Sequence, residues 1–472
     1  MIPESTQKKK LVVIGNGMAG GRLAAELVAR GATKHYDISI FGDEPGGSYN
    51  RILLSDVLNG SKMPESIVIH PLEWYEANHL TLHAGERVIA VDRMNRLVQG
   101  DRGTTLHYDT LVFATGSRAF IPPMEGLSAP WGERKSGVFV MRTLRDCAGI
   151  AGYAQKAQRA IVVGGGLLGL EAARGLMEHG AAVHLVHRSN CLMSAQLDQV
   201  SGKFLKDTVE KMGITVHLDK DTKAILGEES ATGLAFSDGT ELPCDMVVVA
   251  CGIAANIELA REAGLAIEKA IVVDDQMQVE ENIYAVGECA QHRGEVYGLV
   301  APIWEQARVL ADVLTGRTAA YSGSKLAVKL KVMGVELASM GRTREREGDE
   351  IVCYQEAQRG RYKKLVIRDG RLAGAILLGD VRKTATLAQF FDRQMPLPEE
   401  RASLFFDIGK GAGNTTKALP DDATVCNCNG VSAGKIRACI KEGANEISLV
   451  MASTKAGTGC GSCKSQLREF LG

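Results

Sequence analysis

The chain has 472 residues, of which 45% are hydrophobic and 24% charged, and its 55 Lys+Arg and 56 Asp+Glu leave a formal charge of −1. This length predicts roughly three or four domains, and the charge balance argues against a nucleic-acid-binding protein, which would carry a basic excess or stripe. The sequence shows no secretory signal before the first strand and no uninterrupted apolar run of about 18 residues, so we expect a cytoplasmic protein without a membrane span.

The cysteines indicate a reducing compartment. They number 11, an odd count, and none precedes Cys147. Four of them form two close pairs near the C-terminus. Such a distribution favours one local metal site over the disulfide framework of a secreted protein.

The first elements in chain order predict a nucleotide-binding unit. A buried strand at residues 11–14 leads through a glycine turn into a helix at 22–30 and a second strand at 37–41. Gly15, Gly17 and Gly20 form the G-x-G-x-x-G fingerprint, which permits a tight turn, approach of a pyrophosphate and close helix–strand packing. An acidic pair follows the second strand, and we favour Glu44 as the ribose acceptor. The alternative is a glycine turn that binds no nucleotide.

A second copy of this unit starts near residue 160. Gly164, Gly166 and Gly169 repeat the fingerprint, with Glu171 just inside the helix. The ribose position after the next strand holds His187-Arg188 instead of an acid. A cationic pair there favours NADPH, whereas two solvated side chains at a strand end would be compatible with NADH. The sequence leaves this choice open.

Two further motifs indicate which unit binds flavin. Thr115 and Gly116 lie in LVFATGS, and Gly287 and Glu288 lie in NIYAVGECA. Both resemble the flavin-contact motifs of two-dinucleotide-domain flavoprotein reductases. This resemblance implies an α/β fold with an FAD-binding domain at 1–120 plus 250–320 and an inserted NAD(P)-binding domain at 121–249. Glu288 stands where the family has Asp and keeps a carboxylate for a ribityl hydroxyl.

A dithiol relay beside the flavin is not expected. Residues 43–60 contain no cysteine, and residues 121–160 contain only Cys147. Cys289 neighbours a flavin motif, but a single thiol there favours packing over catalysis.

Short alternating stretches predict an α+β C-terminal domain at 321–410, with an antiparallel sheet and a helix near 384–393. A Gly-, Thr- and Asp-rich stretch at 411–422 predicts a linker, and a small cysteine-bearing module follows at 423–472.

The four paired cysteines predict a metal centre. Cys426 and Cys428 are followed 31 residues later by Cys460 and Cys463. Four thiolates can hold a [2Fe–2S] cluster. A structural zinc site and a redox dithiol at the second pair remain alternatives, although zinc pairs usually have wider spacing than the first pair.

The module also resembles the bacterioferritin-associated ferredoxin family, through CNCNGVSAGKIRACI and GTGCGSCKSQL. The resemblance implies a small helical [2Fe–2S] domain ligated by these four cysteines. Cys439 lies outside the pattern and is expected in the core.

From residue 10 to about 400 the chain resembles the N-terminal half of NAD(P)H-dependent assimilatory nitrite reductase large subunits. It is equally similar to the electron-transfer subunit of assimilatory nitrate reductases. The motifs are IGNGMAGGRLAAEL, EPGGSYNRILLS, FATGSRAFIPP, VVGGGLLGLEAARGL, LMSAQLD and YAVGECA followed by GLVAP. By this resemblance the segment 49–55 packs beside the flavin, so Arg51 is expected to contact FAD.

Together these patterns predict two cofactor-binding sets, with no catalytic residue assigned. The FAD set is Gly15, Gly17, Met18, Ala19, Gly20, Glu44, Arg51, Val88, Thr115, Gly116, Gly287 and Glu288. The NAD(P) set is Gly164, Gly166, Leu168, Gly169, Glu171, His187, Arg188 and Gly252, with Glu171 in a positioning role.

The predicted function is electron transfer from NADH or NADPH through FAD and a [2Fe–2S] cluster. No cysteine set for a [4Fe–4S]–sirohaem site is found, so we expect the chain not to reduce nitrite by itself. The preferred acceptor is the molybdenum-containing catalytic subunit of an assimilatory nitrate reductase. Alternatives are a separate nitrite reductase, a ferredoxin or rubredoxin, a place in an opine or amino-acid dehydrogenase complex, and a sensing role.

Overall fold

A computed structural model describes residues 8–325, 327–406, 419–426, 429–458, 461 and 463–471. The chain divides into two compact units, and each is described by itself. The first comprises Met1–Arg51, Met63–Arg118 and Ile253–Ser324, and the second Ile52–Lys62, Ala119–Gly252 and Lys325–Gly472. Most of the expected linker, as well as Cys428 and Cys460, lies outside the described residues.

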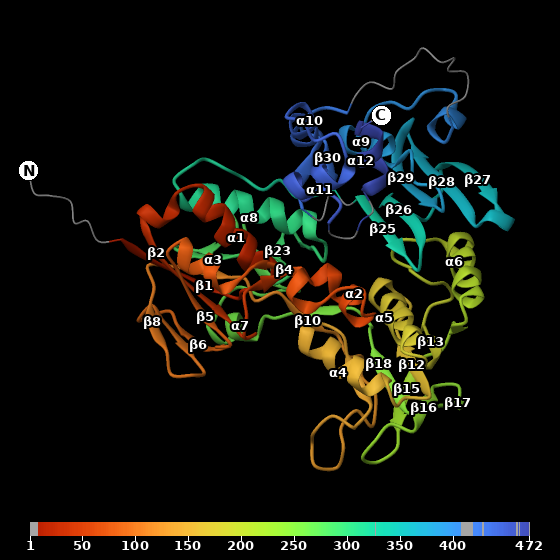
Figure 1. The fold of residues 1–472 in the computed structure, drawn as a ribbon, viewed down its shortest axis with the longest axis horizontal. Helices are drawn as coiled ribbons and strands as arrows, with labels where there is room; N and C mark the ends of the chain where they lie inside the picture. The colour runs from red at the N-terminus through yellow and green to blue at the C-terminus, as the bar shows by residue number, and fades with distance from the viewer. Residues whose placement is uncertain are drawn as a thin grey trace, which may run out of the picture. The chain divides into compact units, whose positions relative to one another are not determined.

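A six-stranded sheet forms the centre of the first unit (Figure 1). Its order is β21 (Gln278–Glu280), β22 (Ile283–Ala285), β9 (Thr110–Phe113), β1 (Lys9–Ile14), β2 (Tyr36–Gly42) and β5 (Leu80–Ala84). The pairs from β22 to β5 are parallel, and β21 joins antiparallel at the edge. Because such strands are covered on both faces, they are apolar runs, as in the LVVI of β1. The strands predicted at residues 11–14 and 37–41 are confirmed as β1 and β2.

Helices α1 (Met18–Ala29) and α8 (Val300–Leu314) pack together in this unit (Figure 1). The sequence predicted the start of α1 at residue 22, but the helix begins at Met18, because the glycine turn leads directly into its first turn. The shorter helical segments are η1 (Ala32–Lys34), η2 (Arg51–Leu53), η3 (Pro64–Ile67), α3 (Leu72–Ala77) and α7 (Glu258–Glu262). The small sheets are β3 (Ser48–Tyr49) with β4 (Val68–His70), β6 (Val88–Asp92) with β7 (Leu97–Gly100) and β8 (Thr105–His107), and β20 (Ile271–Val273) with β23 (Ala290–His292) and β24 (Glu295–Val296).

The second unit contains a five-stranded parallel sheet that repeats the α/β pattern. Its order is β11 (Val138–Val140), β18 (Met246–Val249), β12 (Arg159–Val163), β13 (Ala182–Val186) and β14 (Thr215–His217). The associated helices are α2 (Leu54–Leu58), α4 (Leu144–Ala154), α5 (Leu167–Glu178) and α6 (Gln199–Lys211). Capping boxes fix where α4 and α6 begin, at Thr143/Asp146 and Asp198/Ser201. A small sheet of this unit joins β15 (Thr222–Leu226) to β16 (Gly233–Phe236) and β17 (Glu241–Pro243). A separate two-stranded sheet consists of β10 (Ser117–Ala119) and β19 (Ile253–Ala255).

An antiparallel sheet follows, as the alternating sequence predicts. Its order is β25 (Ala327–Val332), β26 (Val335–Gly341), β29 (Arg371–Leu378), β28 (Arg361–Arg368) and β27 (Glu350–Glu356), accompanied by α9 (Thr384–Arg393), η4 (Ala357–Arg359) and η5 (Arg401–Leu404). The cysteine module contains β30 (Thr424–Cys426), β31 (Val431–Ser432), α10 (Ala433–Lys441), α11 (Ile447–Thr454) and α12 (Lys464–Leu471). The small helical module predicted from the sequence is therefore confirmed.

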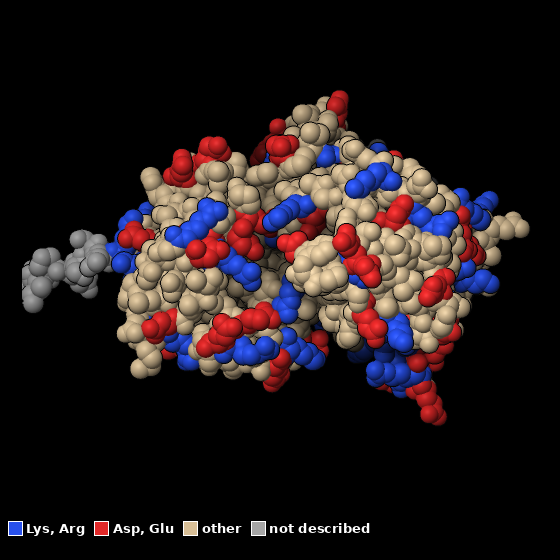
Figure 2. All heavy atoms as spheres, turned by 90° about the horizontal axis from the view of Figure 1, so that it is seen from below, with Lys and Arg blue, Asp and Glu red and all other residues tan. Residues whose placement is uncertain are grey.

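Within the described part of the chain, none of the helices combines the length and apolar character needed to cross a membrane. On the face drawn in Figure 2, acidic and basic side chains are interspersed and do not gather into a stripe of one sign. This distribution agrees with the near-zero net charge and gives no electrostatic footprint for nucleic acid on that face.

Candidate cofactor sites

Two glycine turns of the same local geometry follow β1 and β12. Gly15 has φ +114° and donates its amide to the Phe41 carbonyl at 2.8 Å, while an added Cβ would lie 2.2 Å from the Ala114 carbonyl oxygen. Gly164 has φ +124° and donates to the Val186 carbonyl at 2.8 Å. The first glycine of each fingerprint is therefore required by backbone conformation and packing.

The second and third glycines have different roles. A Cβ on Gly20 would lie 1.9 Å from the Gly15 oxygen, and one on Gly169 would lie 1.7 Å from the Gly164 oxygen. By contrast, a Cβ on Gly17 would meet only the Arg51 side chain, at 3.9 Å, and one on Gly166 would meet nothing within 4 Å. The protein itself does not require glycine at these last two positions. Each leaves open backbone at a helix N-terminus, which fits the approach of a pyrophosphate.

Glu44 and Arg51, both expected at the FAD site, form one polar cluster with Tyr49. The Arg51 guanidinium contacts the Glu44 carboxylate at 2.6 Å, and the Tyr49 hydroxyl donates to both oxygens of that carboxylate at 2.9 and 3.1 Å. Tyr49 was not singled out from the sequence, although it lies in the segment that carries the family resemblance. The cluster places a carboxylate and a cation beside the open turn at Gly17.

Asn256, which was also missed, clamps the LVFATGS motif. Its side-chain amide donates to the Thr115 carbonyl at 2.8 Å, and the Thr115 hydroxyl donates to the Asn256 carbonyl at 2.8 Å. Gly116 has φ +63° and no heavy atom within 4 Å of an added Cβ. Next to it, the Ser117 hydroxyl donates to the Glu288 carboxylate at 2.6 Å. The two flavin-like motifs thus meet through this hydrogen bond.

Gln306 on α8 holds Gly287, the glycine of the second flavin-like motif. Its side-chain oxygen accepts the Gly287 amide at 2.9 Å, and the residue is 0% exposed. Its Nε2 is buried and has no hydrogen-bond partner among the described residues. An orphaned buried donor fits a site whose bound group completes it. A lone Gln within a helix carries no recognisable sequence signal.

The remaining residues of the FAD set belong to helix and strand starts of the first unit. Met18 and Ala19 start α1, and Val88 starts β6 with 7% exposure in the core of the first unit. Cys289 is fully buried and its thiol donates to the carbonyls of Phe113 and Val286, while burial raises its pKa. This is a packing role.

His187, directly after β13, contacts the backbone of the second glycine turn. Its Nδ1 accepts the Gly165 amide at 3.0 Å, so the proton of the neutral ring lies on Nε2. Burial, followed by the charge of Arg188, lowers the pKa of His187. The sequence left the charge of this pair open, and the hydrogen bond from Gly165 together with the lowered pKa favours a neutral His187 beside Arg188. Nε2 is buried and unpartnered within the described chain.

Of the other residues of the NAD(P) set, two follow this turn directly and Gly252 follows β18. Leu168 and Glu171 belong to the first half of α5, where Glu171 is half-buried. Gly252 has φ +111° and an open Cβ position. Open glycines and an unpartnered imidazole N–H together fit a dinucleotide.

Cys426 and Cys463 lie in one apolar core of the cysteine module, with exposures of 2% and 3%. Cys439 belongs to the same core, as expected, and the side chain of Ile52 packs against it. Among the described residues, which do not include Cys428 and Cys460, no group of three or more metal-ligating side chains is found. Two buried thiols from distant parts of the module, in one apolar core, fit a thiolate-ligated centre.

Residues 9–308 match the family model of pyridine nucleotide-disulphide oxidoreductases. The chain belongs to this family. Residues 327–395 match the C-terminal domain of rubredoxin NAD+ reductase, and residues 424–472 match the BFD-like [2Fe-2S] binding domain. The cofactors are accordingly FAD, NADH or NADPH and a [2Fe–2S] cluster, and the protein is an NAD(P)H-dependent FAD oxidoreductase.

Individual relatives agree with this assignment. Nitrite reductase [NAD(P)H] of Bacillus subtilis is 42% identical over 98% of this chain and 57% of its own length. The assimilatory nitrate reductase electron transfer subunit of the same organism is 39% identical over 98% of this chain and 60% of its own length. This chain thus spans less than two thirds of each. A crystal structure of a ferredoxin reductase from Rhodopseudomonas palustris has a TM-score of 0.75 at 26% identity, covering 84% of this chain and 97% of that one.

Proposed function

We propose that the chain is the electron-transfer component of an assimilatory nitrate reductase, and that a molybdenum-containing catalytic subunit accepts its electrons. One observation carries the proposal: two open glycine turns and a buried pair of thiols occur in a single chain. The 39% identical relative, an assimilatory nitrate reductase electron transfer subunit, supports the choice of acceptor. The free thiols of the described cysteines support a reducing compartment, the cytoplasm.

When bound, FAD would supply two-electron chemistry towards NAD(P)H and one-electron chemistry towards an iron–sulfur centre. The residues of the chain would bind and orient these cofactors. The turn from Gly15 to Gly20 with Arg51 would hold the FAD pyrophosphate, Glu44 the ribose, and Ser117 with Glu288 the ribityl chain. The turn from Gly164 to Gly169 would hold NAD(P)H, and Cys426, Cys428, Cys460 and Cys463 would ligate the cluster. No proton transfer by a side chain is required.

The test is an anaerobic titration with NADH and with NADPH, followed by optical and EPR spectra. Wild type should show bleached flavin bands and a [2Fe–2S] signal. Cys463→Ser should retain the flavin bleaching and lose the signal, whereas Cys353→Ser, a control at an exposed thiol outside the module, should retain both. Bleached flavin without an iron signal, together with bound zinc, would overturn the one-electron path.

A nitrite reductase is the second candidate acceptor, because the 42% identical relative is a nitrite reductase. Mixing the reduced protein with either purified catalytic partner separates the two candidates. Reoxidation of the iron–sulfur signal by the nitrate reductase subunit plus nitrate supports the proposal. Reoxidation only by a nitrite reductase plus nitrite overturns the choice of acceptor.

A further inference from the structure

A loop at residues 191–198 holds the second glycine turn from one side. The Met193 amide donates to the Gly165 carbonyl at 2.9 Å, and the Gly165 amide donates to Nδ1 of His187 at 3.0 Å. Both backbone groups of Gly165 are therefore bound by the segment that follows β13. In a planar trans peptide the N–H points opposite to the C=O, so the Gly166 amide is directed away from the loop. The loop thus sets the direction of the amide at the open side of the turn.

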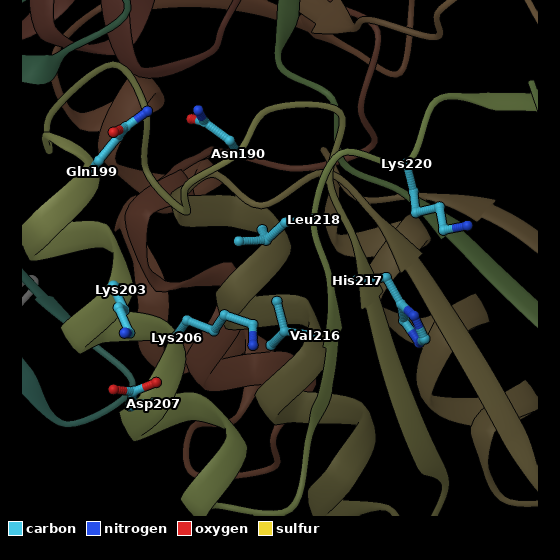
Figure 3. Close-up of a pocket in the computed structure, with 9 residues that line it drawn as sticks. All are labelled: Asn190, Gln199, Lys203, Lys206, Asp207, Val216, His217, Leu218 and Lys220. Carbon is cyan, nitrogen blue, oxygen red and sulfur yellow. The ribbon is translucent and has the colours of Figure 1, made fainter. Parts of the chain in front are cut away.

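The loop is packed between this turn and α6. Its apolar side chains have exposures of only 0–2%, at Cys191, Leu192, Met193 and Leu197. A Cβ on Gly202 of α6 would lie 2.7 Å from Cβ of Cys191, so the helix approaches the loop closely. Figure 3 shows Asn190 and Gln199, the residues that flank the loop, at the wall of a cavity of about 580 Å³. Met193 has φ +53°, a conformation that a non-glycine residue keeps only where its surroundings fix it.

Asp198 ends the loop and connects it to the antiparallel sheet. Its Oδ1 accepts the Ser201 amide at 2.9 Å and so caps α6. Its Oδ2 accepts a hydrogen bond from the Tyr362 hydroxyl at 2.8 Å and one from the Lys364 ammonium at 3.0 Å. Burial raises the pKa of Asp198, but these hydrogen bonds outweigh burial, and the pKa lies below its usual value. One ionised carboxylate therefore joins the nucleotide-binding part of this unit to its C-terminal sheet.

Tyr362 and Lys364 both reach Asp198 because they are two residues apart on β28 and point to the same face of the sheet. Both side chains are buried. Lys363, which lies between them, points to the other face and pairs with Asp380 at 2.9 Å. Two neighbouring buried lysines thus have different partners, one within the C-terminal domain and one in the nucleotide-binding part.

We propose that Tyr362 and Lys364 are positioning residues for the nicotinamide coenzyme. They hold Asp198, which fixes the loop at residues 191–198, and the loop orients the glycine turn. The C-terminal sheet thereby raises the affinity for NADH or NADPH through Asp198. The inference rests on the proposed function, which places the coenzyme at the second glycine turn.

The test is anaerobic stopped-flow reduction of the flavin-loaded protein over a range of NADH and NADPH concentrations. The concentration dependence gives an apparent Kd, and the plateau gives the rate of flavin reduction. Lys364→Met removes a charge-assisted hydrogen bond and should raise the apparent Kd about tenfold. Tyr362→Phe, which leaves the ion pair, should raise it by a smaller factor. The plateau rate should stay unchanged, because the lost interaction affects ground state and transition state alike.

Lys363→Met is the matched control, because it breaks a buried ion pair of the same strand that does not involve Asp198. It should lower the melting temperature and leave the apparent Kd unchanged. Asp198→Asn should weaken coenzyme binding as well. The double variant Asp198→Asn/Lys364→Met should bind no more weakly than Asp198→Asn alone, since both changes act on one contact.

An equal rise of the apparent Kd in Lys363→Met would reveal only a loss of stability and would overturn the proposal. Unchanged Kd values in Lys364→Met and Tyr362→Phe would overturn it too. If Lys364→Met does not fold, Tyr362→Phe, which removes a single hydroxyl, decides between these outcomes.

Gly166→Ala separates this inference from the proposed function. Weak coenzyme binding in Gly166→Ala, with normal binding in the two β28 variants, overturns the inference alone. Normal binding in Gly166→Ala overturns the placement of the coenzyme at this turn. A wild-type flavin that neither coenzyme reduces overturns the proposed function itself.

Discussion

The side-chain oxygen of Gln306 accepts the amide of Gly287 at 2.9 Å, within the buried contact between α8 and the last flavin-like motif. Gly287 has φ +92°, and a Cβ there would lie 2.7 Å from Cβ of Ala19 in the first turn of α1. One amide side chain therefore ties the motif to α8, while Gly287 itself packs against the first turn of α1.

Gln306→Leu should reduce flavin content and destabilise the protein by about 1–3 kcal/mol, because the buried Gly287 amide loses its acceptor. The ratio of flavin to protein absorbance and thermal unfolding with added FAD measure these two effects. Gln358→Leu, at an exposed position in η4, is the matched control. Full flavin content in Gln306→Leu would show that the hydrogen bond is dispensable.

The second and third glycines of each turn should respond differently to alanine. Gly17→Ala and Gly166→Ala leave the polypeptide unstrained, since the added Cβ meets nothing closer than 3.9 Å. The first should therefore lose FAD and the second NAD(P)H binding, at nearly unchanged stability of the cofactor-free protein. Isothermal titration and thermal melts measure both. Loss of stability in these two variants would contradict an open turn.

Gly20→Ala should instead destabilise the fold itself, because its Cβ would lie 1.9 Å from the Gly15 carbonyl oxygen. Overpacking of this kind costs about 1–3 kcal/mol or more. Urea unfolding of the cofactor-free protein is the measurement. A Gly20→Ala variant as stable as Gly17→Ala would contradict the division of roles between the two glycines.

The sequence predicts most of this fold because its signals are local. The turns at Gly15 and Gly164, the apolar run of β1 and the alternating strands of the antiparallel sheet each depend on neighbours in the chain. Helix α9 begins and ends at the residues expected, Thr384 and Arg393. The start of α1 was placed four residues late, because glycine lowers helix propensity, whereas tertiary packing keeps these glycines helical.

The sites were less predictable where they depend on contacts between distant segments. Asn256 bonds Thr115 across 141 positions, and Gln306 bonds Gly287 from another helix. Nothing in either local sequence marks these contacts. The sequence also left the charge at His187 open, because protonation depends on burial and on the amide of Gly165.

In the cluster of Glu44, Tyr49 and Arg51, the carboxylate orients the Arg51 guanidinium. We therefore expect flavin retention to depend on the orientation of Arg51 as well as on its charge. Glu44→Gln removes the charge that holds Arg51 at 2.6 Å, and Arg51→Ala removes the cation beside the Gly17 turn. Both should weaken FAD binding about tenfold, the loss expected for one charge-assisted contact. Tyr49→Phe, which keeps both charges, should have a smaller effect. Fluorescence titration of FAD measures the three affinities, and an equal loss in Tyr49→Phe would contradict a role for the ion pair.

Asp380 and Lys363 form a buried pair at 2.9 Å in the C-terminal sheet, with 2% exposure of the lysine. Hydrogen bonds from Arg382 and then Lys363 hold the Asp380 pKa well below its usual range. A lowered carboxyl pKa stabilises the fold above the unfolded value of about 4, and this contribution is lost as the pH falls through the folded pKa. Asp380→Asn, which leaves a buried ammonium unpaired, should destabilise the protein at pH 7 by about 3–5 kcal/mol. Melting curves from pH 7 down to 3 should show the difference from wild type shrinking below about pH 4. A constant difference would contradict an ionised Asp380.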